Sequence, residues 1–279
     1  MFYRDQNSEH HNRGDSPKNP ARRNLLKVAA LGGMGALAAS GAMVRTAAHT
    51  PVHAAEPAGG FYAPQMVVNS RMIYIGWTPA DKAACAALVP SELTPSANAT
   101  CFMNQYIVDR PEQTSEFGAY SLTYAGVEVE GLNVNESTPG RWWTHYFNTL
   151  SRMREYTAAI GVPSSPGSTT VELRGDLIVA TTRVGEKPII RTTARVGLSA
   201  GVVGGQLLYL TKKDGVIIGG RYPYVTEYVA DFKVLSLEFL DPSNSAYVLR
   251  PADPLDVKFG FYSPSSSFCY PGGQGPIDL

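Results

Sequence analysis

The chain has 279 residues with 24 basic and 24 acidic side chains. Residues 1–54 hold seven of the basic and three of the acidic ones, so residues 55–279 keep 17 basic and 21 acidic side chains. This mildly acidic body argues against the basic surface that nucleic-acid binding requires, and we expect no nucleic-acid partner. The many Gly, Pro and Tyr residues (27, 20 and 15) favour a β-rich fold with many turns.

The N-terminal segment has the pattern of an export signal. The pair Arg22 and Arg23 precedes two leucines, a lysine and the apolar, small-residue run 28–44. This order is typical of a twin-arginine signal, and the run is a poor candidate for a stable membrane span. We expect cleavage near Ala54/Ala55 and a periplasmic or secreted protein. The alternative is an uncleaved amphipathic anchor.

The remainder is predicted to form one domain. Residues 1–54 combine a polar, disordered start with the signal, and no repeat or linker divides residues 55–279. The Pro/Gly/Ser-rich stretch from about Ser263 to the C-terminus predicts a surface tail.

Strand patterns dominate the first half of this domain. Runs of β-branched and aromatic residues predict three strands: Met72–Trp77 within the segment Gln65–Trp77, Thr100–Asp109, and Glu116–Glu130 with a hairpin-like Tyr124-Ala125-Gly126. After the first strand we expect a short helix with Thr78 as N-cap and Pro79 in its first turn, ended by Pro90. The stretch His145–Pro163 predicts a helical or bent segment that stops at Gly161-Val162-Pro163.

Hairpins follow in the second half. Residues 170–174 and 177–181 alternate around Gly175-Asp176, and residues 206–210 and 216–218 flank the turn Lys212-Lys213-Asp214-Gly215. Residues 222–240 predict one or two more strands. Together these elements indicate one β-barrel or sandwich with few helices.

Three stretches, in this order, resemble the acetoacetate decarboxylase family: Tyr74–Leu93, His145–Pro163 and Arg174–Lys187. With weaker similarity further on, the resemblance covers about residues 65 to 262. It implies a mainly β (α+β) fold, with a closed, cone-like β-barrel that encloses an apolar cavity and few short helices. It also implies a homo-oligomer and lyase (decarboxylase) chemistry without a cofactor.

The resemblance departs at the catalytic positions. The family's decarboxylases use a lysine of lowered pKa that forms an imine with a ketone. This lysine aligns with Ala158, the family's arginine aligns with Trp77, and its two glutamates fall near Met103 and Leu122. The resemblance therefore implies the scaffold without the imine mechanism.

Three side chains are candidate catalytic groups. His145 has an unperturbed pKa suited to proton transfer at neutral pH, or it is a hydrogen-bonded histidine packed among aromatic rings. Arg154 would clamp a substrate carboxylate, or it pairs with Glu155 on the surface. Glu128 would be an acid or base if it faces inward, and a solvated side chain if it faces outward.

Seven further residues are candidates for contact with the substrate: Trp77, Met103, Gln105, Tyr120, Leu122, Trp142 and Ala158. Tyr106 and Tyr124 are predicted to belong to the core or the cavity lining. An aromatic, largely uncharged cavity favours an apolar or aromatic carbonyl or carboxylic-acid ligand.

We expect no metal and no cofactor, because residues 55–279 contain a single histidine and no carboxylate or cysteine pattern with ligand spacing. The three cysteines are Cys85, Cys101 and Cys269. Export permits a Cys85–Cys101 disulfide, and buried free thiols are the equal alternative.

Three functions remain open. The first is an exported lyase-type enzyme that works without the lysine imine. The second is a non-catalytic carrier of a small molecule, and the third is a true decarboxylase whose lysine has moved to Lys187, Lys233 or Lys258.

Overall fold

A computed structural model describes residues 58–135 and 138–277. The predicted leader and export signal lie outside these residues. The described strands are β1 (Gln65–Trp77), β2 (Thr94–Pro95), β3 (Cys101–Val108), β4 (Tyr120–Glu130), β5 (Gly140–Asn148), β6 (Ser164–Pro166), β7 (Ser168–Arg174), β8 (Leu177–Val184), β9 (Lys187–Arg195), β10 (Ser199–Lys213), β11 (Val216–Val229), β12 (Lys233–Phe239), β13 (Val257–Tyr270) and β14 (Gly275–Pro276). The described helices are η1 (Ala58–Gly60), α2 (Lys82–Ala86), η2 (Pro111–Gln113), α3 (Ser151–Ala158) and η3 (Ser245–Leu249). None of these described helices has the length and apolar character to span a membrane.

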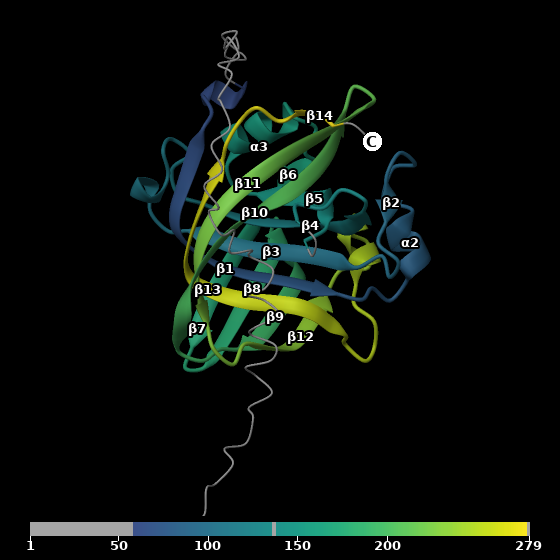
Figure 1. Cartoon of the computed structure of the whole chain (residues 1–279). Coiled ribbons are helices and arrows are strands. Elements are labelled where there is room, and N and C mark those ends of the chain that lie inside the picture. The colour runs from purple at the N-terminus through teal and green to yellow at the C-terminus, as the bar shows by residue number, and fades with distance from the viewer. Residues whose placement is uncertain (1–57, 136–137, 278–279) are drawn as a thin grey trace, which may run out of the picture.

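Seven strands close into a β-barrel in the order β4-β3-β1-β13-β11-β10-β5, and β5 pairs again with β4 (Figure 1). All neighbours in this ring are antiparallel except β10 and β5. The predicted fold class, a mainly β structure with a closed barrel and few short helices, is confirmed.

A second sheet, β12-β9-β8-β7, packs over the outer face of β1, β3 and β4 (Figure 1). Because side chains alternate along a strand, each barrel strand serves two cores. On β1, Tyr74 points into the barrel, while Ile73 and Ile75 pack against the second sheet. On β3, Tyr106 points inward and Met103 outward.

A polar layer lies between the barrel and the second sheet. Gln105 Nε2 donates to Thr182 Oγ1 at 2.9 Å, and Thr192 Oγ1 donates to Gln105 Oε1 at 2.6 Å. The Thr123 hydroxyl is hydrogen-bonded to Thr169 and Thr182. Every one of these buried side chains has a partner, so the layer fixes how the two sheets align.

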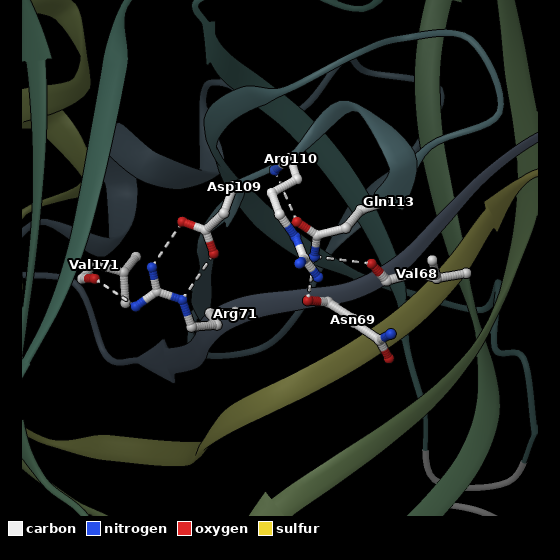
Figure 2. A network of polar contacts seen from close by, with 7 residues as sticks. All are labelled: Val68, Asn69, Arg71, Asp109, Arg110, Gln113 and Val171. Atoms are coloured by element: carbon white, nitrogen blue, oxygen red, sulfur yellow. Dashed lines mark hydrogen bonds and ion pairs between the residues drawn. The ribbon is translucent and has the colours of Figure 1, made fainter.

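A second polar network ties the start of β1 to its surroundings (Figure 2). The Arg71 guanidinium donates to both carboxylate oxygens of Asp109, at 3.1 and 2.8 Å, and to the carbonyl of Val171 in the second sheet. The Gln113 amide donates to the carbonyls of Val68 and Asn69. These polar groups are occupied by contacts within the fold.

Two sequence predictions for the first half of the barrel are wrong: the start of the short helix and a hairpin within β4. The short helix begins at Lys82 with Asp81 as its N-cap, whereas Thr78 donates its hydroxyl to Asp256 at 2.7 Å. The hairpin-like Tyr124-Ala125-Gly126 is wrong, because β4 runs through it without a turn.

The predicted surface tail from Ser263 is also wrong. Residues 257–270 form β13, which pairs with β1 and with β11 in the middle of the barrel wall. Tyr270 is buried among other tyrosines. The His145–Pro163 stretch divides in two, since His145 lies on β5 and the helix α3 begins only at Ser151.

Candidate functional site

The barrel interior contains a cavity of about 220 Å³. Its lining is dominated by aromatic side chains that point inward from all seven barrel strands: Tyr74, Tyr106, Tyr124, Trp143, Tyr209, Tyr222, Tyr224, Phe259, Phe261, Phe268 and Tyr270. Tyr106 and Tyr124 were expected in the core or the lining, and both line this cavity. Such a lining favours an apolar or aromatic ligand body.

Arg141 is the only Lys or Arg residue in the described lining of the cavity. It lies on β5, is only 5% exposed, and places its guanidinium 5.3 Å from the ring centres of both Tyr74 and Phe259. Its Nη2 lies 3.3 Å from Glu128 Oε1. Its Nε and Nη1 have no hydrogen-bond partner among the described residues.

Glu128 lines the same cavity from β4. Burial raises the pKa of this carboxyl, and the neighbouring Arg141 offsets part of the rise. Its neighbour on the same face, Glu130, lies at the strand end, where it accepts a hydrogen bond from the Ala97 N–H. Glu128 is therefore the inward-facing acid of this strand.

The tyrosine hydroxyls in the lining pair with one another. The Tyr209 hydroxyl donates to Tyr74 at 3.3 Å and lies 2.6 Å from the Tyr124 hydroxyl, which accepts a hydrogen bond from Asn104 Nδ2. Burial raises the pKa of Tyr74, Tyr124 and Tyr209, so these phenols stay neutral. The cavity thus has one cation, one carboxyl and a neutral aromatic wall.

Four of the five buried side-chain N and O atoms that lack a partner in the described chain belong to this lining. They are Arg141 Nε, Arg141 Nη1, Trp143 Nε1 and Asn104 Oδ1. Unpaired buried polar atoms are costly, and the occurrence of four of them in residues around one cavity makes this cavity the candidate functional site.

Similar folds exist among solved structures. An acetoacetate decarboxylase structure matches with a TM-score of 0.52 at 15% identity, over 78% of this chain and 90% of that chain. The acetoacetate decarboxylase from Legionella pneumophila gives a TM-score of 0.55 at 12% identity, over 77% and 87%. The enduracididine biosynthesis enzyme MppR gives 0.54 at 12% identity, over 80% and 91%.

The fold is that of acetoacetate decarboxylase. Neither the scan of protein-family models nor the search of curated proteins finds a match to this sequence. A likeness at 12–15% identity shows the fold alone, so the chemistry of this acetoacetate-decarboxylase-like barrel follows from its own residues.

None of the described residues that line the cavity of this acetoacetate-decarboxylase-like barrel is a lysine. Lys187 forms an ion pair with Asp241, Lys258 forms one with Asp256, and Lys233 is exposed. Ala158, which the sequence analysis placed at the position of the family's lysine, is exposed on α3 and lies outside the described cavity lining. Within residues 58–135 and 138–277, no group of three or more His, Cys, Asp or Glu is arranged to hold a metal ion.

The structure places nine of the ten predicted site residues outside the cavity lining, and Glu128 alone within it. Three of these residues lie on the outward face of β1 and β3 and contact the second sheet: Trp77, Met103 and Gln105. Tyr120 and Leu122 are inside the barrel but packed in its aromatic core, away from the lining.

His145 is turned away from the cavity by a β-bulge. Gly126 pairs with Trp143 and Ala125 pairs with His145, so Thr144 is an extra residue in β5. An extra residue reverses the side-chain parity beyond it, which puts Tyr146 inside the barrel and His145 outside. The His145 ring is hydrogen-bonded to the hydroxyls of Thr144 and Ser245.

The remaining two predicted site residues, Arg154 and Trp142, form hydrogen bonds within the fold. Arg154 Nη1 donates to the carbonyl of Asn148 at 2.8 Å, at the start of α3. Trp142 Nε1 donates to the carbonyl of Leu88 at 2.9 Å, on the outer side of β5. Sequence reasoning missed Arg141, although its spacing from Trp143 was a usable signal, because residues two apart on a strand share a face.

Proposed function

We propose that the cavity of this acetoacetate-decarboxylase-like protein binds a small carboxylic acid with an apolar or aromatic body, and that Arg141 holds the carboxylate. The observation that carries the proposal is Arg141, a cation in an otherwise aromatic cavity lining, whose Nε and Nη1 have no partner among the described residues. A buried guanidinium with unpaired N–H groups is unfavourable, and a carboxylate supplies two charge-assisted acceptors.

Glu128 alone does not satisfy this guanidinium. It occupies Nη2 at 3.3 Å, which is long for a charge-assisted hydrogen bond, and leaves the Nε and Nη1 donors without acceptors. Aromatic rings on the faces of Arg141 stabilise its charge without using those donors. An anion within the plane of the guanidinium therefore adds to the existing contacts instead of replacing them.

The raised pKa of Glu128 supports a second function, lyase-type catalysis by proton transfer. A carboxyl that stays protonated nearer to neutral pH can donate a proton to, or accept one from, a carbonyl acid bound at Arg141. This step forms no imine, in keeping with a described lining that lacks a lysine amine. A carrier without catalysis uses the same cavity and the same anchor.

The proposed localisation follows from the leader. A twin-arginine signal would deliver the folded protein to the periplasm or the medium, and we expect it there as a homo-oligomer. Cell fractionation of the wild-type chain and of an Arg22→Lys/Arg23→Lys variant tests this. Retention of the variant in the cytoplasm is expected, and equal export of both chains would contradict the proposal.

The binding experiment compares 3-phenylpropanoate with 3-phenylpropanamide, which has the same body and no charge. We expect isothermal titration calorimetry to detect binding of the acid at least tenfold tighter than binding of the amide. Equal binding of the two, or binding of neither, overturns the proposal.

Variants locate the anchor. Arg141→Met should abolish the preference for the acid, and Arg141→Met/Glu128→Gln provides the same test without an uncompensated Glu128 carboxylate. Arg152→Met is the control, because Arg152 packs on Phe61 and donates to the Gly59 carbonyl outside the cavity. Mass analysis of a keto-acid panel then separates turnover from carriage, and borohydride treatment should trap no adduct on a lysine.

A further inference from the structure

We infer that Gly76 and Phe259 together limit the size of the ligand body that the cavity accepts, with Gly76 as the positioning residue for the Phe259 ring. The inference rests on the proposed function, because it concerns the same cavity and the same carboxylate anchor, Arg141. It narrows the ligand class to carboxylic acids with a compact body, of the size of one aromatic ring.

Gly76 and Phe259 are directly paired residues of β1 and β13. Side chains at paired antiparallel positions project to the same side of the sheet. Tyr74, two residues before Gly76 on β1, projects into the barrel and lines the cavity. A side chain at position 76 would therefore point into the barrel as well.

The Phe259 ring occupies the space that a side chain at position 76 would need. Carbon atoms in contact are normally about 3.5–4.0 Å apart. A Cβ added to Gly76 would overlap Cε1 of the Phe259 ring and would lie 2.5 and 2.7 Å from its Cζ and Cδ1. Gly76 does not have a positive φ. Its backbone therefore suits other residues too, and the ring is what requires glycine here.

The same ring forms part of the cavity wall beside the carboxylate anchor. Phe259 lines the cavity, whereas Gly76 does not, so the ring separates Gly76 from the ligand space. It stacks on Tyr74 with centroids 5.7 Å apart and planes at 29°, and its centre lies 5.3 Å from the Arg141 guanidinium. A side chain at position 76 would push this half-buried ring inward, toward the cavity and Arg141.

The cavity has little volume to spare. Its volume of about 220 Å³ is below the range of about 300–1,000 Å³ that is usual for drug-sized ligands. A ring displaced into this space competes with the ligand body, and a smaller side chain at position 259 widens the space. The glycine and the ring that it accommodates thus define the size limit next to Arg141.

The test measures the dissociation constants of 3-phenylpropanoate and 3-(2-naphthyl)propanoate by calorimetry. We expect the wild type to bind the phenyl acid about tenfold tighter than the naphthyl acid, and Phe259→Ala to abolish this preference. Gly76→Ala should weaken binding of the phenyl acid about tenfold. In the Phe259→Ala background, the same change should alter affinity less than about twofold, because the ring is absent.

This non-additivity distinguishes a positioning role from a general loss of packing. Gly275→Ala is the matched control, since a Cβ there meets nothing within 4 Å and Gly275 lies outside the described lining. If Gly76→Ala does not fold, the size preference of Phe259→Ala and the affinity of the double variant still decide the inference.

Three results overturn the inference and leave carboxylate binding intact. They are equal binding of the two acids by the wild type, an unchanged preference in Phe259→Ala, and a loss from Gly76→Ala that persists without the ring. Failure of the wild type to bind either acid overturns the inference together with the proposed function.

Discussion

Glu128 and Arg141 occupy directly paired positions on β4 and β5, and their side chains meet inside the barrel with Oε1 and Nη2 3.3 Å apart. Side chains at paired antiparallel positions project to the same side of the sheet. The ladder thus brings a carboxyl and a guanidinium into a cavity that is otherwise aromatic. Burial favours the neutral carboxyl, while Arg141 favours the charged one, and the balance raises the pKa of Glu128.

The first prediction concerns this pair and the affinity for anions. A charged Glu128 repels a ligand anion at Arg141, so Glu128→Gln should tighten the binding of a phenylalkyl sulfonate by about tenfold, or about 1.4 kcal/mol. The sulfonate keeps its charge across the pH range. Calorimetry at several pH values above 5 measures the effect, with Glu130→Gln as the control.

The pH dependence has a defined sign. Below the raised pKa of Glu128 the carboxyl is neutral and wild-type affinity is high, and affinity falls as the pH rises through that pKa. Burial also raises the pKa of the lining tyrosines, which therefore do not titrate in this range. Glu128→Gln should show no such decline. A wild-type affinity that is independent of pH would contradict this account.

The second prediction concerns His145 and stability. Burial lowers the pKa of His145 from 6.5 to about 4, so folding favours the neutral ring. Its contribution to stability is complete above about pH 6.5 and is lost as the pH falls through about 4. We expect this contribution to be about 1–3 kcal/mol at neutral pH.

Urea unfolding of the wild type and of His145→Gln from pH 7 to pH 4 measures this contribution. The wild type should lose about 1–3 kcal/mol more than the variant over that interval. The variant should bind 3-phenylpropanoate as well as the wild type does, because His145 lies outside the cavity lining. Loss of acid binding in the variant would restore the site role that the sequence suggested.

The third prediction concerns Gln105, which the sequence analysis named as a candidate substrate contact. Gln105→Leu leaves Thr192 without its acceptor and removes a partner of Thr182, so unfolding should become easier by about 1–3 kcal/mol. The double variant Gln105→Leu/Thr192→Val should recover part of that loss. Denaturant unfolding measures both, and unchanged stability with lost ligand binding would refute the structural role.

Local sequence signals were sufficient for the hairpins. The Gly175-Asp176 turn and the strands on either side were predicted within a few residues, as was the Asp214-Gly215 turn between β10 and β11. The strand predicted over Met72–Trp77 forms the second half of β1, which begins earlier, at Gln65. In these segments the turn chemistry and the alternation of side chains agree, so the pattern determines the structure without tertiary information.

The strand β13 could not be predicted in this way, because Ser263–Ser267 contains four serines and a proline. The barrel accommodates Pro264 at an irregularity of the ladder, where Ser70 pairs with Ser266 but Met72 pairs with Ser263. A proline is tolerated at such a bulge because no ladder hydrogen bond from its nitrogen is required. Pairing with two neighbours outweighs the weak local propensity of this strand.

The cavity-facing residues of β5 could not be identified from the sequence either, because their orientation depends on strand pairing. Which side of β5 faces the cavity depends on the bulge at Thr144, and a single inserted residue exchanges the inner and outer faces. In a regular strand without this bulge, His145 would point into the barrel together with Arg141 and Trp143. The register that separates His145 from Arg141 is set by pairing between β4 and β5, which the local sequence does not encode.

The fourth prediction concerns Cys85 and Cys101, whose sulfur atoms lie 3.7 Å apart while both thiols are free. A disulfide requires about 2.05 Å, so a small approach of α2 toward β3 suffices. Of the two thiols, Cys85 is the better nucleophile, because its hydrogen bond with Cys101 lowers its pKa.

Export to an oxidising compartment would favour closure of this pair. We expect oxidised glutathione to convert the two thiols to a disulfide, with release of two equivalents of reduced glutathione. The closed loop of about 15 residues should stabilise the fold by up to about 3 kcal/mol. Peptide mapping of Cys269→Ser measures the link and thermal unfolding measures its effect. Adducts on single cysteines without a Cys85–Cys101 peptide would show that burial of the two thiols prevents closure.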